Sequence, residues 1–437
     1  MQSTDQWLTK FNMAANVYRN ALYGDTTIKG TERERFANQF QSWIHEFKEG
    51  RASSLSVLES ELESEDVYRY NAAARLLIEL ADLKPLQRLS EKIIQSGKPR
   101  LSDHNLTLLW IAAPPDVNLF EQLAGRWEQI SFVQAFLNQP SIEAATLLER
   151  ILDTDEMGLS KFAIEAAISW VEKDRLKQFM DKPSAKQIIG DYVFEDARFP
   201  AAFYLGLGGD SKAISFLEDN ASGDDLTQAS FACHYLGWLA LPNALRPVKR
   251  LLGSKDTYAV ALTLGTAVSL GSPALIPILL DLISWKVNTR IDPKPISDLA
   301  IQALRQIIGA PLDNLSEKYV PESFPAEYTD TYRKEVMKVC QEILPDFQLT
   351  LRYHSGYLVT LAHLAEDLLN PHSSPICVAA HNLKAITGED YGFNLNADLI
   401  TNLPAIKAWK KRAENPQPLT TPGGWAFKGF PLSDLSV

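Results

Sequence analysis

The 437-residue chain has few cysteines, no excess of basic residues and no run of glycine or proline. Its three cysteines, Cys233, Cys340 and Cys377, are too few for a disulfide framework and suit a reducing cytoplasm. Lysine and arginine number 43 against 54 acidic residues, a net charge of −11, which argues against a general binder of nucleic-acid phosphates. Hydrophobic residues make up 46% and charged residues 22%, which excludes a disordered or collagen-like protein.

The sequence also lacks a recognisable secretory signal and a convincing membrane span. Asp5 and Lys10 interrupt the N-terminal stretch and no apolar core follows them, so we expect no cleaved leader. The run from Thr257 to Leu280 contains no charged residue and is long enough to cross a bilayer. Because Gly271 and Pro273 break this run, we expect two short buried helices and no membrane partner.

Apolar residues repeat at three- and four-residue steps over most of the chain, whereas the alternating pattern of strands is nearly absent. One N-terminal stripe consists of Trp7, Leu8, Phe11, Ala14, Ala15, Tyr18 and Leu22. A second consists of Phe36, Phe40, Trp43, Ile44 and Phe47. Each stripe covers one side of a helix, so the sequence predicts an all-α fold.

A repeat of helix pairs is visible between residues 199 and 312. The dipeptides Leu205-Gly206, Leu236-Gly237 and Leu264-Gly265 recur about 30 residues apart, each followed by a turn and another apolar helix. This period is typical of an α-solenoid, in which stacked helix pairs share one core. We expect the glycines to let neighbouring helix backbones approach closely.

A second internal similarity links two segments 79 residues apart. The matching residues are Ala300, Leu304, Ile307 and Gly309 in the first segment, and Ala379, Leu383, Ile386 and Gly388 in the second. Each set predicts a helix that ends in Ile–x–Gly, with the glycine in a left-handed conformation.

The helical units at 56–94 and 199–312 resemble HEAT or HEAT-like repeats. Residues 386–392, Ile-Thr-Gly-Glu-Asp-Tyr-Gly, followed by Ala405-Ile406 and Trp409, resemble the closing unit of bacterial HEAT-repeat proteins.

A further segment narrows this resemblance. Arg352-Tyr353-His354, Gly356 and residues 360–364 resemble one such bacterial family, which is sometimes encoded beside type VI secretion clusters. The resemblance implies a HEAT-like α-α superhelix of stacked antiparallel helix pairs. It also implies an adaptor, accessory or immunity role around a secreted effector.

We predict six parts along the chain. They are N-terminal helical repeats (1–100), an irregular helical region (101–198), HEAT-like repeats (199–312), an insertion (313–350), a C-terminal HEAT-like cap (351–414) and an irregular aromatic tail (415–437). The tail carries Trp425, Phe427 and Phe430 among prolines and glycines. It is either a disordered end or an arm whose aromatic side chains pack on the last repeat.

The chemical candidates are weak. His354, His363, His372 and His381 recur every nine residues, with Cys377 near the last, but nine residues is two and a half helical turns and points successive members to opposite sides. The acidic clusters are typical of solvated turns and helix caps: Glu61, Glu63, Glu65 and Asp66, then Asp153, Asp155 and Glu156, then Glu195 and Asp196. We therefore assign no catalytic residue, no cofactor and no metal.

Recognition of another protein is the function that this pattern favours, because a solenoid offers an extended concave face. The contact residues we predict are Tyr235, Trp238 and Tyr258, and the partner we expect is a toxin or a secretion component, with no nucleic acid bound. Two alternatives stay open: a HEAT-like enzyme such as a bilin lyase, and a structural protein that self-assembles through its tail.

Overall fold

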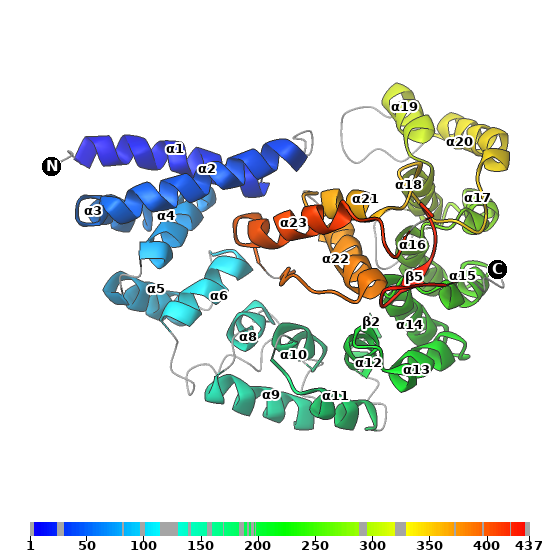
Figure 1. Cartoon of the computed structure of the whole chain (residues 1–437), viewed down its shortest axis with the longest axis horizontal. Helices are drawn as coiled ribbons and strands as arrows, with labels where there is room; N and C mark the ends of the chain where they lie inside the picture. The colour runs from blue at the N-terminus through cyan, green and yellow to red at the C-terminus, as the bar shows by residue number, and fades with distance from the viewer. Residues whose placement is uncertain are drawn as a thin grey trace. The chain divides into compact units, whose positions relative to one another are not determined.

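The computed structural model describes most of the chain. The residues outside the description are 1–3, 24–29, 81–82, 97–100, 114–129, 139–140, 155–159, 169, 183–187, 190–191, 194–195, 197, 288–294, 320–328, 371–372, 396, 420 and 433–437. The chain divides into two compact units. Unit 1 comprises residues 1–175, 366–376 and 391–409, and unit 2 comprises residues 176–365, 377–390 and 410–437. The described residues are mostly helical (Figure 1), which confirms the all-α prediction.

Unit 1 is built from helices that pack against their neighbours in sequence. They are α1 (Thr4–Tyr23), α2 (Gly30–Glu49), α3 (Arg51–Glu61), α4 (Val67–Leu80), α5 (Leu83–Ser96), α6 (Asp103–Ala112), α8 (Ile130–Leu137), α9 (Ile142–Thr154) and α10 (Ser160–Ala167). The predicted apolar stripes bring α1 and α2 together: Trp7 meets Phe47 at 5.0 Å between ring centroids, and Tyr18 meets Phe40 at 4.9 Å. Leu8 is the exception, since it is exposed.

Later segments complete unit 1. The buried guanidinium of Arg33 donates to the carbonyls of Ala21 and Leu369, at 3.2 and 2.8 Å. Helix α23 (Leu399–Ala413) begins in this unit, where Asp398 bonds the buried Arg75 of α4 at 3.3 Å.

The regular part of unit 2 consists of two helix layers. The first layer holds α12 (Arg198–Leu207), α14 (Leu226–Trp238), α16 (Thr257–Leu270) and α18 (Ile296–Ile308). The second holds α13 (Ser211–Ala221), α15 (Leu245–Leu252) and α17 (Ile276–Leu282), the last two preceded by the 3₁₀ turns η3 (Pro242–Ala244) and η4 (Pro273–Leu275). Each first-layer helix packs on the next and on a neighbour in the second layer, so the helices stack in pairs as a HEAT-like solenoid does.

The remaining elements of unit 2 are short or lie at its ends. They are the end of α11 (Lys173–Met180), the hairpin β1 (Ile188–Ile189) and β2 (Tyr192–Val193), α19 (Ala310–Tyr319), α20 (Asp330–Ile343), η5 (Leu344–Asp346), α21 (Leu361–Asp367) and most of α22 (Ser373–Thr387). Two further hairpins pair β3 (Tyr353–His354) with β4 (Tyr357–Leu358) and β5 (Ala426–Phe427) with β6 (Phe430–Pro431). Thus α19 and α20 lie largely in the predicted insertion, and a hairpin lies in the predicted tail.

The uncharged run from Thr257 to Leu280 forms α16 and most of α17, separated by Gly271 and the turn η4. Gly271 has a left-handed φ of 60° and ends α16, as its position before Pro273 predicted. Among the described helices, none combines the length and the apolarity needed to span a membrane.

Helices α14 and α16 run side by side in the same direction. Near their beginnings, the Ser230 hydroxyl donates to the Ala259 carbonyl at 3.2 Å, and near their ends Gly237 packs against Thr266. Aspartates cap both beginnings: Asp225 accepts the amide of Gln228, and Asp256 accepts the amides of Tyr258 and Ala259. The N-terminal ends of these helices therefore lie at one edge of the layer and the C-terminal ends at the other.

The two C-terminal hairpins each bind the end of one helix. The amides of Ser355 and Gly356, at the tip of β3–β4, donate to Gln306 and Ile307 at the end of α18, at 2.6 and 3.0 Å. The tip of β5–β6 binds α22 in the same way, through the amides of Lys428 and Gly429 and the carbonyls of Ala385 and Ile386, at 2.7 and 2.9 Å. These are the two helix ends that match in sequence. Their glycines, Gly309 and Gly388, have positive φ values of 73° and 72°, as predicted, but the ψ of −134° at Gly309 differs from that of a left-handed helical residue.

Side chains from the C-terminal part bind the remaining helix ends of the first layer. The buried guanidinium of Arg352 donates to Ser269 and Leu270 of α16, both at 3.0 Å, and to the amide oxygen of Asn382. The Asn382 amide group donates to the Trp238 carbonyl of α14 at 3.1 Å, and the Lys428 ammonium donates to the Leu207 carbonyl of α12 at 3.1 Å. These donors satisfy carbonyls that a helix end leaves free, and the cations meet the negative end of the helix dipole.

Candidate functional site

The three residues predicted as protein contacts lie in two different places. Tyr235 and Trp238 lie on the last turn of α14, where Tyr235 is only 2% exposed and Trp238 is half-buried. Tyr258 is half-exposed on the first turn of α16. Because α14 and α16 run in the same direction over about 20 Å, Tyr258 lies at the opposite end of the layer from Trp238. The structure brings Tyr235 and Trp238 together and separates Tyr258 from them.

Trp238 belongs to an aromatic cluster formed by three helices. Phe203 of α12 lies 5.2 Å from the Tyr235 ring and 5.6 Å from the Trp238 ring. His234 lies 4.3 Å from Trp238 on the same helix, and His381 of α22 stacks on Trp238 at 4.7 Å with 27° between the ring planes. The cluster therefore joins the end of α14 to a helix more than 140 residues later.

An uncharged surface runs along α14 and α16, and we call it the uncharged face. Its members are the exposed Gly265 of α16 and eight half-buried residues: Thr227, Phe231, His234 and Trp238 of α14, and Tyr258, Ala261, Leu262 and Val268 of α16. Their three- and four-residue spacing places each set on one side of its helix, next to the seam between the two helices. Neither helix contains Asp, Glu, Lys or Arg. The face therefore offers apolar and aromatic contact without ion pairs.

Gly265 distinguishes this face from an ordinary half-buried surface. It is exposed in the middle of α16, and a Cβ atom added to it would meet no heavy atom within 4 Å. By contrast, a Cβ on Gly237 would lie 2.9 Å from the Thr266 methyl group, so Gly237 is required by helix packing. The expectation that the repeated glycines allow close helix approach is confirmed at Gly237 and is wrong at Gly265. A glycine inside a helix costs about 0.5–1 kcal/mol relative to alanine, and no contact within the chain explains that cost at Gly265.

The part of α22 in unit 2 covers the C-terminal end of the uncharged face. His381 is buried against Trp238 and against Phe203, whose ring centroid lies 4.8 Å away at 89°. Burial, together with the basic neighbours Lys384 and His234, lowers the pKa of His381 to about 3. The imidazole is therefore neutral at pH 7 and packs as an aromatic ring.

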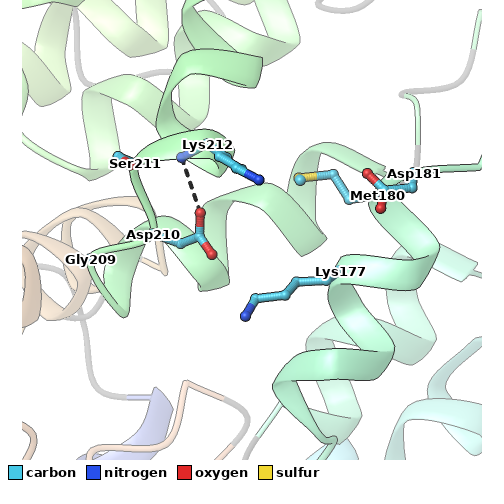
Figure 2. Close-up of a pocket in the computed structure, with 7 residues that line it drawn as sticks. All are labelled: Lys177, Met180, Asp181, Gly209, Asp210, Ser211 and Lys212. Carbon is cyan, nitrogen blue, oxygen red and sulfur yellow. Dashed lines mark hydrogen bonds between the residues drawn. The ribbon is translucent and has the colours of Figure 1, made fainter.

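A separate polar pocket of about 460 Å³ lies between the end of α11 and the turn from α12 to α13. Figure 2 shows Lys177, Met180 and Asp181 on one side and Asp210 and Lys212 on the other. Asp210 is occupied as the cap of α13, since it accepts the amides of Lys212 and Ala213. Because the two lysines and two aspartates cancel in charge, the pocket has no net preference for an anion or a cation.

Two of the three cysteines of unit 2 are used in packing. Cys233 and Cys340 are buried, and burial raises the pKa of each thiol to about 12, so neither is a nucleophile at neutral pH. His363 contacts the Leu358 carbonyl at 3.0 Å. Of the acidic and histidine clusters noted in the sequence, Asp155, Glu156, Glu195 and His372 lie outside the described residues. Within the described residues, no three His, Cys, Asp or Glu side chains come together as a metal site.

No protein-family model and no curated protein matches this chain. The candidate site therefore stands on the geometry of unit 2. Two of the residues predicted as contacts, Trp238 and Tyr258, lie on the uncharged face, and the sequence prediction did not include Leu262 and Gly265 between them. The signal was present in the sequence, because the uncharged run that begins at Thr257 contains every α16 residue of this face.

Proposed function

We propose that this protein is a non-catalytic protein-binding module that holds its partner on the uncharged face of α14 and α16. The observation that carries the proposal is the exposed Gly265 in the middle of α16. The missing Cβ atom of Gly265 allows the backbone of a partner to approach α16 closely, as the missing Cβ atom of Gly237 allows α14 and α16 to approach each other. The aromatic residues at the two ends of the face, Trp238 and Tyr258, are the type that anchors protein interfaces.

The chemistry of the face defines the partner segment. It is apolar and lacks charged side chains where it meets Leu262 and Gly265, because a charge buried there would find no counter-charge on α14 or α16. A role as adaptor, accessory or immunity protein for a secreted bacterial effector, in the cytoplasm, is our narrower proposal. Its support is the resemblance of residues 352–364 and 386–409 to bacterial HEAT-repeat proteins.

A pair of charge substitutions tests the proposal. Leu262→Asp and Gly265→Asp each place a charge at the centre of the face, on side chains that are half-exposed or exposed and so leave the core intact. The matched control is Ser215→Asp, at an exposed position of the second-layer helix α13. We expect wild type and Ser215→Asp to capture the same protein from native lysate, and both face variants to lose at least about tenfold of it.

Mass spectrometry of the captured protein and circular dichroism of each variant give the readout. A partner retained by both face variants contradicts the proposed site. Recovery of no partner by folded wild-type protein counts against a protein-binding function.

A further inference from the structure

We propose that residues 377–387 of α22 form an acid-released cover over the aromatic end of the uncharged face. This inference rests on the proposed function, because it describes how access to the same face is regulated. The cover and the face belong to the same compact unit.

His381 and Asn382 hold the cover against α12 and α14, and the amides of Lys428 and Gly429 in the β5–β6 hairpin hold its C-terminal end. His381 inserts its ring between Trp238 and Phe203, at 4.7 and 4.8 Å between ring centroids. Asn382 donates to the Trp238 carbonyl at 3.1 Å and accepts from Arg352. Both residues are buried, so every one of these contacts must break when the cover lifts.

The buried ring of His381 has a polar atom without a partner. Its Nδ1 atom makes no hydrogen bond to a described residue, so the neutral ring gains packing energy but no compensation for a proton. The packed neighbours are aromatic on both sides, which suits the neutral ring.

Two basic residues, one on α22 and one on α14, oppose the protonation of His381. On α22 itself, Lys384 lies one turn further on, and on α14 His234 faces the same indole ring. The tyrosine of α12, Tyr204, lies 6.4 Å from the imidazole, and Tyr235 completes the α14 side. Arg352 reaches the cover at Asn382. Lys384 and His234, the two residues whose charge acts on the His381 pKa, are both basic. They therefore repel a positive charge on the His381 ring.

The direction of the pH effect follows from proton linkage. The pKa of His381 is about 3 when the cover is closed and 6.5 when the ring is free in water. Between these values the open state binds more protons than the closed state, so acidification favours opening. From pH 7.5 to pH 5.0 the equilibrium constant for opening rises about 30-fold.

Opening adds to the face the aromatic rings that the cover hides. Trp238 loses the ring stacked on it, and Phe203 becomes accessible beside it. A partner that binds at neutral pH on the α16 part therefore gains an aromatic anchor at acidic pH.

Hydrogen exchange measured by mass spectrometry on the full chain, without a partner, tests the cover. We expect the protection factors of amides in residues 377–387, corrected for intrinsic exchange, to fall about 30-fold between pH 7.5 and pH 5.0. Amides of α15, in the second layer, should change less than about threefold over the same range.

Two variants remove the titrating group. His381→Phe keeps an aromatic ring of similar size, and His381→Gln serves if the phenyl ring disturbs folding, with circular dichroism at pH 7.5 as the check. In both we expect the pH response of residues 377–387 to fall below about threefold. The inference is overturned if the protection of residues 377–387 in the wild type does not change with pH, or if α15 loses protection equally. It is also overturned if the pH response of residues 377–387 persists in both variants.

This experiment is independent of the test of the proposed function. If the cover opens with acid while Leu262→Asp keeps its partner, the binding site is wrong and the conformational device stands. If the face variants lose the partner while protection of the cover does not change with pH, the binding site stands and the acid-released cover is wrong.

Discussion

Gly237 packs directly against Thr266: a Cβ atom on the glycine would lie 2.9 Å from the threonine methyl group. This contact brings α14 and α16 together at their C-terminal ends. One residue before Thr266 lies Gly265, whose Cβ would meet nothing within 4 Å. Two glycines of one sequence repeat thus have different physical roles.

The two glycines provide a matched pair of stability predictions. Gly265→Ala should raise the free energy of unfolding by about 0.5–1 kcal/mol, because alanine restricts the unfolded chain and meets no neighbour. Gly237→Val should lower it by about 1–3 kcal/mol through overpacking against Thr266. Urea denaturation followed by circular dichroism measures both. Destabilisation by Gly265→Ala would contradict this prediction, because it would mean that a Cβ atom at position 265 meets neighbouring atoms.

Arg352 should be a major contributor to the stability of unit 2. Its guanidinium binds two carbonyl oxygens of α16 and the side chain of Asn382, and it is buried. Arg352→Met leaves these oxygens unsatisfied at about 1–3 kcal/mol each, so we expect a loss of at least about 2 kcal/mol in the same denaturation experiment. The control is Arg305→Met, which removes a partly exposed pair with Asp313 and should cost less than about 1 kcal/mol. Equal losses in the two variants would contradict the role of Arg352.

The β5–β6 hairpin should stabilise its own chain. It binds the end of α22 through Lys428 and Gly429, and it buries Trp425, whose indole donates to the Thr350 carbonyl at 2.9 Å. A chain that ends at Glu414 should therefore unfold at a lower temperature in calorimetry, and Trp425→Ala in the full chain should cost about 3–5 kcal/mol.

Light scattering of the same shortened chain addresses self-assembly. We expect its particle mass to fall only by the mass of the removed segment, since the hairpin docks on residues of its own chain. Dissociation into smaller particles would instead support assembly of copies through the tail.

The three thiols should react at different rates. Cys233 and Cys340 are buried with pKa values raised to about 12, whereas Cys377 is half-exposed. At pH 8 an aromatic disulfide reagent should therefore titrate one thiol quickly and the other two only after denaturation. Cys377→Ser should abolish the fast reaction. Two fast thiols in the native protein would show that one of the buried cysteines is accessible.

The helices and their ends were predictable because the information is local. Residues within one or two turns of each other determine the apolar stripe that contains Trp7 and Phe11, the aspartate caps of α14 and α16, and the positive φ of Gly309 and Gly388. The β3–β4 and β5–β6 hairpins were not predicted, because strands of two residues carry no alternating pattern.

The candidate site was only partly predictable. The sequence marks α14 and α16 as uncharged and aromatic, but it does not show which of their sides is buried. Tyr235 was selected with Trp238, and it is buried because its side of α14 packs against Phe203 of α12.

The sequence by itself determined that this chain is helical, that the uncharged run from Thr257 to Leu280 divides into two helices at Gly271, and that two helices share the same Ile–x–Gly ending. The tertiary structure decided that both endings receive a hairpin tip, that Arg352 binds the end of α16, and that His381 lies on Trp238. Hydrogen bonds within a helix join residues four apart, so they are encoded locally. Contacts between residues more than 40 positions apart depend on which apolar sides meet when all the helices pack at once.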